Sequence, residues 1–409
     1  MSSEPLPYHV KIRDFFKGQP GIWSFYSATR QRDEQLTNFK TDLLKNTYQF
    51  HPESDPVLYE KIHIAREKLG LNALPVTAYQ ALTNDPELNA SIVCLSGEAH
   101  MVLSGGVLQI LDEKELLALA AHELAHVKLN ALLEGELETA DRIIMAIANS
   151  PDSSAAQYET ARLFRLYTEI YCDREAYSVL GDATPVITML LKMATGLSVV
   201  HAESYIRQAE EIFSGGGKVQ SGSLTHPENF IRARALAAGS GPDADAIIAQ
   251  MIEGDKELDR LDVMAQQELS SLTEELLYYY LRPEWFRTAP VVSLASQYFS
   301  TFKPGVTSRQ GGMAAPGEAE TGRLKTYLDK AHESIREYFA YVLLDFALAD
   351  PELEDVPAGY ALQVAESCGI SDVFEAVIKK ELAYSDKQWE REREQMRSAF
   401  ASVEDAERS

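Results

Sequence analysis

The feature that most constrains this chain is a pair of histidines four residues apart in an otherwise apolar helical pattern. The helix predicted after Asp112 contains His122, Glu123 and His126. Histidines at positions i and i+4 project from one helix face, a turn apart, where both imidazoles can bind one zinc ion. Glu123 lies about 100° around the helix from His122, within reach of a water molecule at that ion. The pattern predicts a catalytic zinc site with one zinc ion per chain.

A buried helix with two hydrogen-bonded histidines is the alternative interpretation of this pattern. Two imidazoles and a carboxylate on a helix rich in Leu and Ala carry a large desolvation cost unless a charge compensates them. A bound cation supplies that charge, so the zinc interpretation is favoured.

A catalytic zinc ion also needs a third protein ligand and an open position for water. The candidates are carboxylates that follow the histidines in the sequence: Glu134, Glu136, Glu138 and Glu169. Glu169 and Asp173 share one face of a helix predicted at about 155–180, so one carboxylate can bind the metal while the other holds a ligand histidine. An exposed acidic helix face explains this pair taken alone. Beside the two histidines, Glu169 is the best third ligand.

The regions around the zinc motif predict a mostly helical chain with one small sheet. Short β-rich runs between Pro75 and Leu111, separated by turn residues, are typical of a small sheet that leads into the zinc helix. Further helices are predicted at about 29–48, 55–69, 134–148, 155–180, 184–196 and 202–213. Beyond residue 245 the pattern is helical nearly throughout, except for a Gly/Pro/Ala-rich segment at 303–322 that we expect to be flexible.

These patterns divide the chain into three predicted regions. The regions are an N-terminal helical extension at 1–53, a zinc domain at 54–240 and a helical C-terminal domain at 245–409. The predicted fold class is α+β and predominantly helical, with an all-α C-terminal region.

Charge and cysteine usage exclude several classes of partner and compartment. With 38 Lys+Arg against 62 Asp+Glu, the formal net charge is −24, which repels nucleic acids and anionic membranes. No uncharged apolar run is long enough to span a bilayer, and the charged N-terminus does not resemble a signal peptide. Three widely separated cysteines form no CxxC motif. We therefore expect a soluble, cytoplasmic protein with reduced thiols.

Three segments resemble the HtpX-like and CAAX-prenyl-endopeptidase-like zinc metallopeptidases of the gluzincin group. They are the run from Asn89 to Val127 that includes HELAH, the segment EIYCDREA beginning at Glu169, and THPENFIRARAL beginning at Thr225. The three segments occur in the same order as in the family, and the resemblance covers about residues 54–237. The departures are Cys172 where the family has Ala, Ile170 where it has an aromatic residue, and the absence of the transmembrane helices of membrane-bound members.

The resemblance implies a zincin-type domain and assigns roles to its residues. His122, His126 and Glu169 would be the zinc ligands, and Asp173 would hold a ligand histidine. His226 or Arg232 would supply or support the donor that stabilises the tetrahedral oxyanion. Glu123 would take a proton from the attacking water and deliver it to the leaving amine.

Two functions are compatible with these features. The first is a soluble zinc endopeptidase that cleaves unfolded or exposed polypeptide, bound in extended form along an edge strand at 91–96. The second is a catalytically silent, zinc-stabilised scaffold whose C-terminal helices bind a regulatory protein partner. Glu123 favours the first function, because a scaffold does not need a water-activating carboxylate beside its zinc.

Overall fold

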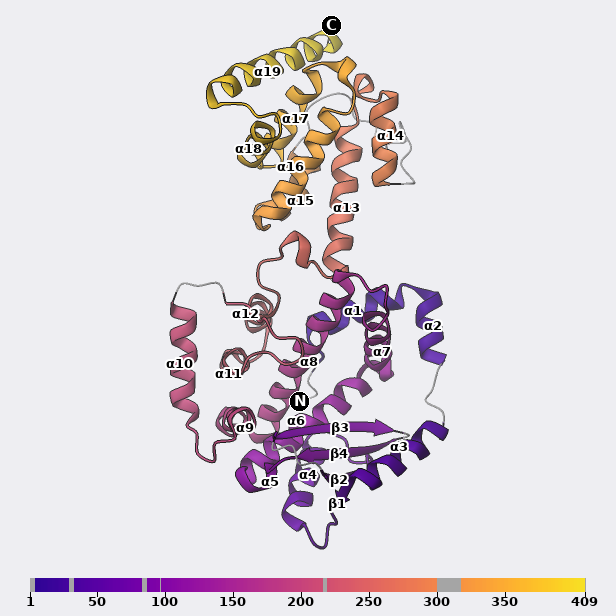
Figure 1. Ribbon diagram of the computed structural model, residues 1–409, viewed down its shortest axis with the longest axis vertical. Helices are drawn as coiled ribbons and strands as arrows, with labels where there is room; N and C mark the ends of the chain where they lie inside the picture. The colour runs from indigo at the N-terminus through magenta and orange to yellow at the C-terminus, as the bar shows by residue number, and fades with distance from the viewer. Residues whose placement is uncertain are drawn as a thin grey trace. The chain divides into compact units, whose positions relative to one another are not determined.

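The computed structural model describes residues 4–28, 33–82, 87–95, 97–215, 219–299 and 318–408. The chain divides into two compact units, Met1–Gly254 and Asp255–Ser409 (Figure 1). Each unit has its own hydrophobic core. The fold is α+β and mostly helical, as the sequence predicts.

The first unit combines one sheet with many helices. Its elements, in chain order, are α1 (Pro7–Lys17), α2 (Pro20–Ala28), α3 (Asp33–Asn46), β1 (Thr47–Gln49), α4 (Pro56–Lys68), β2 (Val76–Ala81), β3 (Asn89–Leu95), β4 (Glu98–Ser104), α5 (Val107–Ile110), α6 (Glu113–Ala131), η1 (Leu132–Gly135), α7 (Glu136–Ala148), α8 (Ala155–Leu180), α9 (Ala183–Thr195), α10 (Ala202–Ser214), α11 (Asn229–Ala238) and α12 (Pro242–Glu253).

The four strands form one mixed sheet in the order β1-β2-β4-β3. Strands β2 and β4 are parallel, and the other two pairs are antiparallel. Ala78 of β2 and Ile92 of β3 both lie opposite Met101 of β4, which is buried in a core shared with α4 and α6. The sheet therefore supports α6 from one side, and β3 lies at its edge.

Helix α6 begins at a strong local signal. The Asp112 side chain accepts hydrogen bonds from the backbone amides of Lys114 and Glu115, and Glu115 Oε2 accepts one from the Asp112 amide. Lys192 of α9 donates to the same Glu115 oxygen at 2.7 Å. This capping box and buried ion pair fix the start of the helix that carries the two histidines.

Helix α8 crosses the unit beside α6. It begins with a capping box between Ser154 and Gln157 and ends at Gly181, whose φ of 71° places it in the left-handed region that glycine tolerates. Its burial is nearly continuous from Thr160 to Ala176, because it packs against α6 on one side and against α1 and α12 elsewhere. Both sides of α8 therefore face protein.

The N-terminal region differs from the sequence prediction. Of the helix predicted at 29–48, residues 29–32 lie outside the described part, α3 covers 33–46, and residues 47–49 form β1. Strand pairing ends the helix before residue 47, because Thr47 and Tyr48 lie opposite Ala81 and Gln80 of β2. Helices α1 and α2 are not among the predicted elements.

The boundaries of the compact units also differ from the predicted regions. Residues 1–53, predicted as an extension, lie in the first unit, where α1 packs against α7 and α8. Helix α12, which falls in the predicted region 245–409, lies in the first unit too. It buries Ile248, Met251 and Ile252 and packs against α8 and α11.

The second unit is helical throughout its described part. Its elements are η2 (Leu258–Arg260), α13 (Val263–Tyr280), η3 (Glu284–Phe286), α14 (Ala289–Tyr298), α15 (Glu318–Leu328), α16 (Glu333–Ala347), η4 (Pro351–Leu353), α17 (Val356–Ser367), α18 (Ser371–Glu381) and α19 (Asp386–Arg408). Of the segment predicted flexible at 303–322, residues 318–322 begin α15 and 303–317 lie outside the described residues.

One stretch of the described chain, Glu113–Ala148, is long and apolar enough to cross a membrane by length and composition. In this protein 61% of its most apolar window is buried inside the fold, as in the core helix of a globular domain. The stretch is also bent, since Leu133 and Glu134 have φ values of 53° and 60° between α6 and α7.

Candidate metal centre

The two histidines of α6 and Glu169 of α8 face one another. Glu169 Oε2 lies 3.4 Å from His122 Nε2, and Glu169 Oε1 lies 3.6 Å from His126 Nε2. His122 and Glu169 are buried, while the His126 side chain keeps 28% of its surface exposed. The packing of α6 on α8 thus gathers two imidazoles and a carboxylate around one point that is open on the His126 side.

Asp173 lies behind this group, one helical turn after Glu169. Its Oδ1 is 3.0 Å from His122 Nδ1, so the carboxylate orients the ring with Nε2 toward Glu169. Arg232 of α11 donates to both Asp173 oxygens at 2.6 Å and lies 3.3 Å from Glu169 Oε2. Three helices distant in the sequence therefore meet at this site.

The donor set fits a divalent cation such as zinc. Glu169 Oε2 is buried and makes no hydrogen bond to another described residue, although His122 Nε2 lies 3.4 Å away and Arg232 Nη2 lies 3.3 Å away. Burial opposes a charge on His122, but the carboxylates of Asp173 and Glu169 outweigh it and raise its pKa to about 10. A metal ion binding at Nε2 must displace that proton. Two imidazoles and one carboxylate are the ligand types of catalytic zinc sites.

Glu123 lies beside the two histidines in α6 and is 7% exposed. Burial raises its pKa to about 7, with a further contribution from the charge of Glu169. A carboxyl group with this pKa can accept and release a proton near neutral pH.

Cys172 is a neighbour of the site that sequence reasoning did not include as a ligand. Its sulfur and one ring nitrogen from each of His122 and His126 all lie within 4.8 Å of one another. The signal was its position three residues after Glu169, on the helix face that turns toward α6. The described residues therefore offer Cys172 as well as Glu169 next to the two histidines.

The carboxylates nearest His126 in the sequence lie elsewhere. Glu136 pairs with Arg13 at 2.6 Å and with Lys17, both on α1. Glu134 and Glu138 are exposed, because the backbone bends sharply between α6 and α7. Glu169 is the member of the four candidates that faces both imidazoles.

The two residues expected near the oxyanion lie in different environments. The His226 side chain is 61% exposed, with its Nε2 3.6 Å from Glu169 Oε1 and its Nδ1 3.0 Å from Thr225 Oγ1. Arg232 is 5% exposed and bound to Asp173. His226 thus lies at the solvent side of the site, whereas Arg232 lies behind the carboxylates.

Comparison with known proteins agrees with this geometry. Residues 52–240 match peptidase family M48. The plastoglobule-localized metallopeptidase 48, chloroplastic, of Arabidopsis thaliana is 25% identical over 167 residues, which are 37% of this chain and 48% of that protein. The match therefore spans about half the length of that relative. No solved structure matches the chain. Residues 52–240 are therefore similar to the metallopeptidases of family M48.

Proposed function

We propose that the protein is a zinc-dependent endopeptidase that cleaves unfolded or exposed polypeptide. The observation that carries this proposal is the Glu169 carboxylate facing His122 and His126, with Asp173 and Arg232 bound behind it. His122, His126 and Glu169 would hold the zinc ion. When bound, zinc supplies Lewis-acid polarisation of the scissile carbonyl and lowers the pKa of a water molecule to about 7.

The chain itself supplies the proton transfer. Glu123 accepts a proton from the attacking water at its carboxylate and delivers it to the nitrogen of the leaving amine. His226, exposed beside Glu169, is the residue best placed to donate a hydrogen bond to the oxyanion of the substrate. Arg232 would act as a positioning residue: it donates hydrogen bonds to Asp173, and Asp173 in turn orients the His122 ring.

The substrate would bind in extended form along β3. This strand lies at the edge of the sheet, and in the described residues its ladder partner is β4. Main-chain pairing to a free edge gives affinity with little side-chain selectivity, which suits unfolded polypeptide as a substrate.

The second unit would act outside the chemistry, by restricting which polypeptides reach the site. Its one histidine, His332, accepts a hydrogen bond from the Ser334 amide at the start of α16, so it serves as a helix cap. We assign no catalytic group to Asp255–Ser409.

Glu123→Gln tests the proposal directly. The variant should retain about one zinc per chain and lose cleavage of an unfolded protein substrate, because the amide keeps the shape of the side chain but accepts no proton. Glu138→Gln, an exposed substitution on α7, is the matched control and should cleave normally. Cleavage at the wild-type rate by Glu123→Gln would refute the mechanism, and zinc binding without cleavage by the wild-type chain would favour the scaffold function.

A further inference from the structure

The face of α8 that carries Glu169 also carries Arg162. The two residues are seven positions apart, which is close to two helical turns, or about 10 Å along the helix axis. Arg162 is 7% exposed, so its guanidinium group lies inside the protein. It contacts residues 219–228, called here the pre-α11 loop, which lead into α11 and include His226. One face of α8 therefore holds both a candidate metal ligand and the loop of His226.

Arg162 binds two backbone carbonyl groups of the pre-α11 loop. Its Nη1 donates to the oxygen of Ser221 at 3.3 Å and to the oxygen of Ser223 at 3.1 Å. Its Nε and Nη2 donate to the two carboxylate oxygens of Glu159, each at 2.7 Å. This bidentate pair fixes the plane of the guanidinium group and balances its charge. The Glu159 pair therefore leaves Nη1 directed at the loop.

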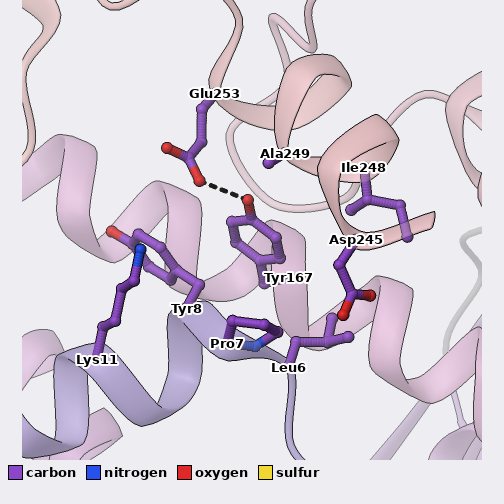
Figure 2. Close-up of a pocket in the computed structure, with 9 residues that line it drawn as sticks. All are labelled: Leu6, Pro7, Tyr8, Lys11, Tyr167, Asp245, Ile248, Ala249 and Glu253. Atoms are coloured by element: carbon purple, nitrogen blue, oxygen red, sulfur yellow. Dashed lines mark hydrogen bonds between the residues drawn. The ribbon is translucent and has the colours of Figure 1, made fainter. Parts of the chain in front are cut away.

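The start of the pre-α11 loop is held by α12. The Ser221 amide donates to the Met251 carbonyl oxygen at 2.8 Å. Gln220 Nε2 donates to the Glu253 carbonyl oxygen at 2.6 Å. The Glu253 side chain in turn accepts a hydrogen bond from the Tyr167 hydroxyl of α8 at 2.6 Å (Figure 2). The start of the loop is thus connected to α8 through α12 as well as through Arg162.

The end of the pre-α11 loop is fixed by its own side chains. The Gly222 amide donates to Oε1 of Glu228, the residue that directly precedes α11, at 3.0 Å. Pro227 is buried. The exposed residues Leu224, Thr225 and His226 therefore lie between two anchored stretches of backbone.

Burial does not fix the His226 ring. Its side chain is 61% exposed, and its Nδ1 lies 3.0 Å from Oγ1 of Thr225 on the same loop. Its Nε2 lies 3.6 Å from Glu169 Oε1. The backbone of the loop therefore decides where this ring lies relative to the metal centre. Because a displacement of about 1 Å near the reacting atoms can lower a rate roughly 100-fold, the anchoring of the loop bears on the chemistry.

We propose that Arg162 is a positioning residue that holds the pre-α11 loop so that His226 stays beside Glu169. Arg162 acts through the two carbonyl groups that it binds, and Glu159 orients it. The inference rests on the proposed function, which gives His226 its role at the oxyanion. Arg232 holds the partner of a metal ligand, whereas Arg162 holds the oxyanion donor, so loss of Arg162 should change turnover and leave zinc affinity unchanged.

The test is a double-mutant cycle in the full-length, zinc-loaded chain, with fluorescein-labelled casein as the substrate. His226→Ala should lower kcat about 100-fold, as loss of an oxyanion donor does. Arg162→Lys should lower kcat about tenfold and leave KM and zinc affinity within about twofold, because Lys cannot bind Glu159 and both carbonyl oxygens at once. In the His226→Ala chain, Arg162→Lys should lower kcat by less than about twofold, because the residue that it positions is gone.

Two further variants complete the cycle. Glu159→Gln, at a side chain with 15% of its surface exposed, keeps the Arg162 charge but weakens the pair that orients it. It should lower kcat by less than Arg162→Lys does, and again without effect in the His226→Ala chain, so it tests the proposal even if Arg162→Lys does not fold. Arg13→Lys is the matched control, because its ion pair with Glu136 joins α1 to α7, and it should cleave casein normally.

Hydrogen exchange of backbone amides measures the anchoring of the loop without any cleavage. Arg162→Lys should speed exchange in residues 219–228 about tenfold and leave exchange in α6 unchanged. Unchanged exchange in the loop, or an equal loss of kcat in the wild-type and His226→Ala backgrounds, would overturn the positioning role and leave the proposed function standing. Absence of casein cleavage by the zinc-loaded wild-type chain would refute the proposed function, and the role of Arg162 with it.

Discussion

Arg232 donates two hydrogen bonds to Asp173, from Nε to Oδ2 and from Nη2 to Oδ1, both at 2.6 Å. The pair is almost fully buried and links α11 to α8. Since Asp173 also lies 3.0 Å from His122 Nδ1, the orientation of a candidate metal ligand depends on an arginine 110 positions later in the sequence.

Arg232→Lys should weaken zinc binding by about 10- to 100-fold while the domain stays folded, because Lys keeps the charge but cannot bind both carboxylate oxygens. Competition with a zinc chelator measures this affinity. Arg234→Lys is the matched control: it lies on the same helix and stacks over Phe213, away from Asp173. Equal zinc affinity of Arg232→Lys and wild type would show that Arg232 has no positioning role.

Loss of a residue that hydrogen-bonds to a metal ligand typically weakens metal binding by roughly 10- to 100-fold. Glu169→Gln should weaken zinc binding by more than this, because Glu169 is the proposed ligand itself. Cys172→Ala should retain the metal. Cobalt substitution separates the two candidates, because a thiolate ligand gives an intense charge-transfer band in the near ultraviolet. We expect no such band in the wild-type protein. A band that disappears in Cys172→Ala would identify Cys172 as a ligand.

We expect the buried His9 to lower the free energy of unfolding at acidic pH. Its ring is fully buried against α8, and this burial lowers its pKa from 6.5 to about 3. As pH falls below 6.5 the unfolded chain takes up a proton that folded His9 refuses, so the free energy of unfolding should fall by about 1.4 kcal/mol per pH unit between about 6.5 and 3. Above pH 6.5 this dependence vanishes.

Urea unfolding at pH 7.5 and 5.5 measures the effect of His9. His9→Gln should lose about 1.4 kcal/mol less of its free energy of unfolding over this interval than the wild-type chain. His63→Gln, at a ring with 63% of its surface exposed, is the control and should behave as wild type. The same pH slope in His9→Gln and wild type would exclude His9 as the cause.

Gly359→Ala should destabilise the second unit by about 3 kcal/mol or more. A β-carbon at this position of α17 would lie 2.1 Å from the backbone oxygen of Met396 in α19. A backbone oxygen cannot move aside by changing a side-chain rotamer, so one of the two helices would have to shift. Gly322→Ala is the matched control in α15: its β-carbon meets nothing within 4 Å, so the substitution should stabilise by about 0.5–1 kcal/mol. Thermal unfolding measures both, and zinc content should be unchanged in each.

A chain ending at Gly254 should fold, unfold cooperatively and bind about one zinc ion. The two cores support this expectation, because among the described residues the buried cluster around α6 and the sheet ends at Leu236, and the cluster of the second unit begins at Leu261. Circular dichroism and metal analysis check the outcome. Insolubility together with loss of zinc would show that the first unit depends on residues after 254.

The parts of the metal centre that the sequence predicts follow from the residue spacing within single helices. The spacing of His122 and His126 is a property of one helix, and so is the spacing of Glu169 and Asp173, so periodicity alone places each pair on a face. The β-rich runs before Asp112 predict the small sheet for the same reason. Resemblance to a known family then connects the two helices, which no local rule does.

Contacts between distant segments lie beyond such rules. Whether Arg232 reaches Asp173, whether Cys172 turns toward the histidines, and whether residues 47–49 extend a helix or pair with β2 all depend on how α6, α8, α11 and the sheet pack. The cavity of about 590 Å³ that is lined by residues 4–7, α8 and the start of α12 also depends on tertiary packing, because these segments are distant in the sequence. Periodicity specifies which side chains share a face, but only packing decides what that face meets.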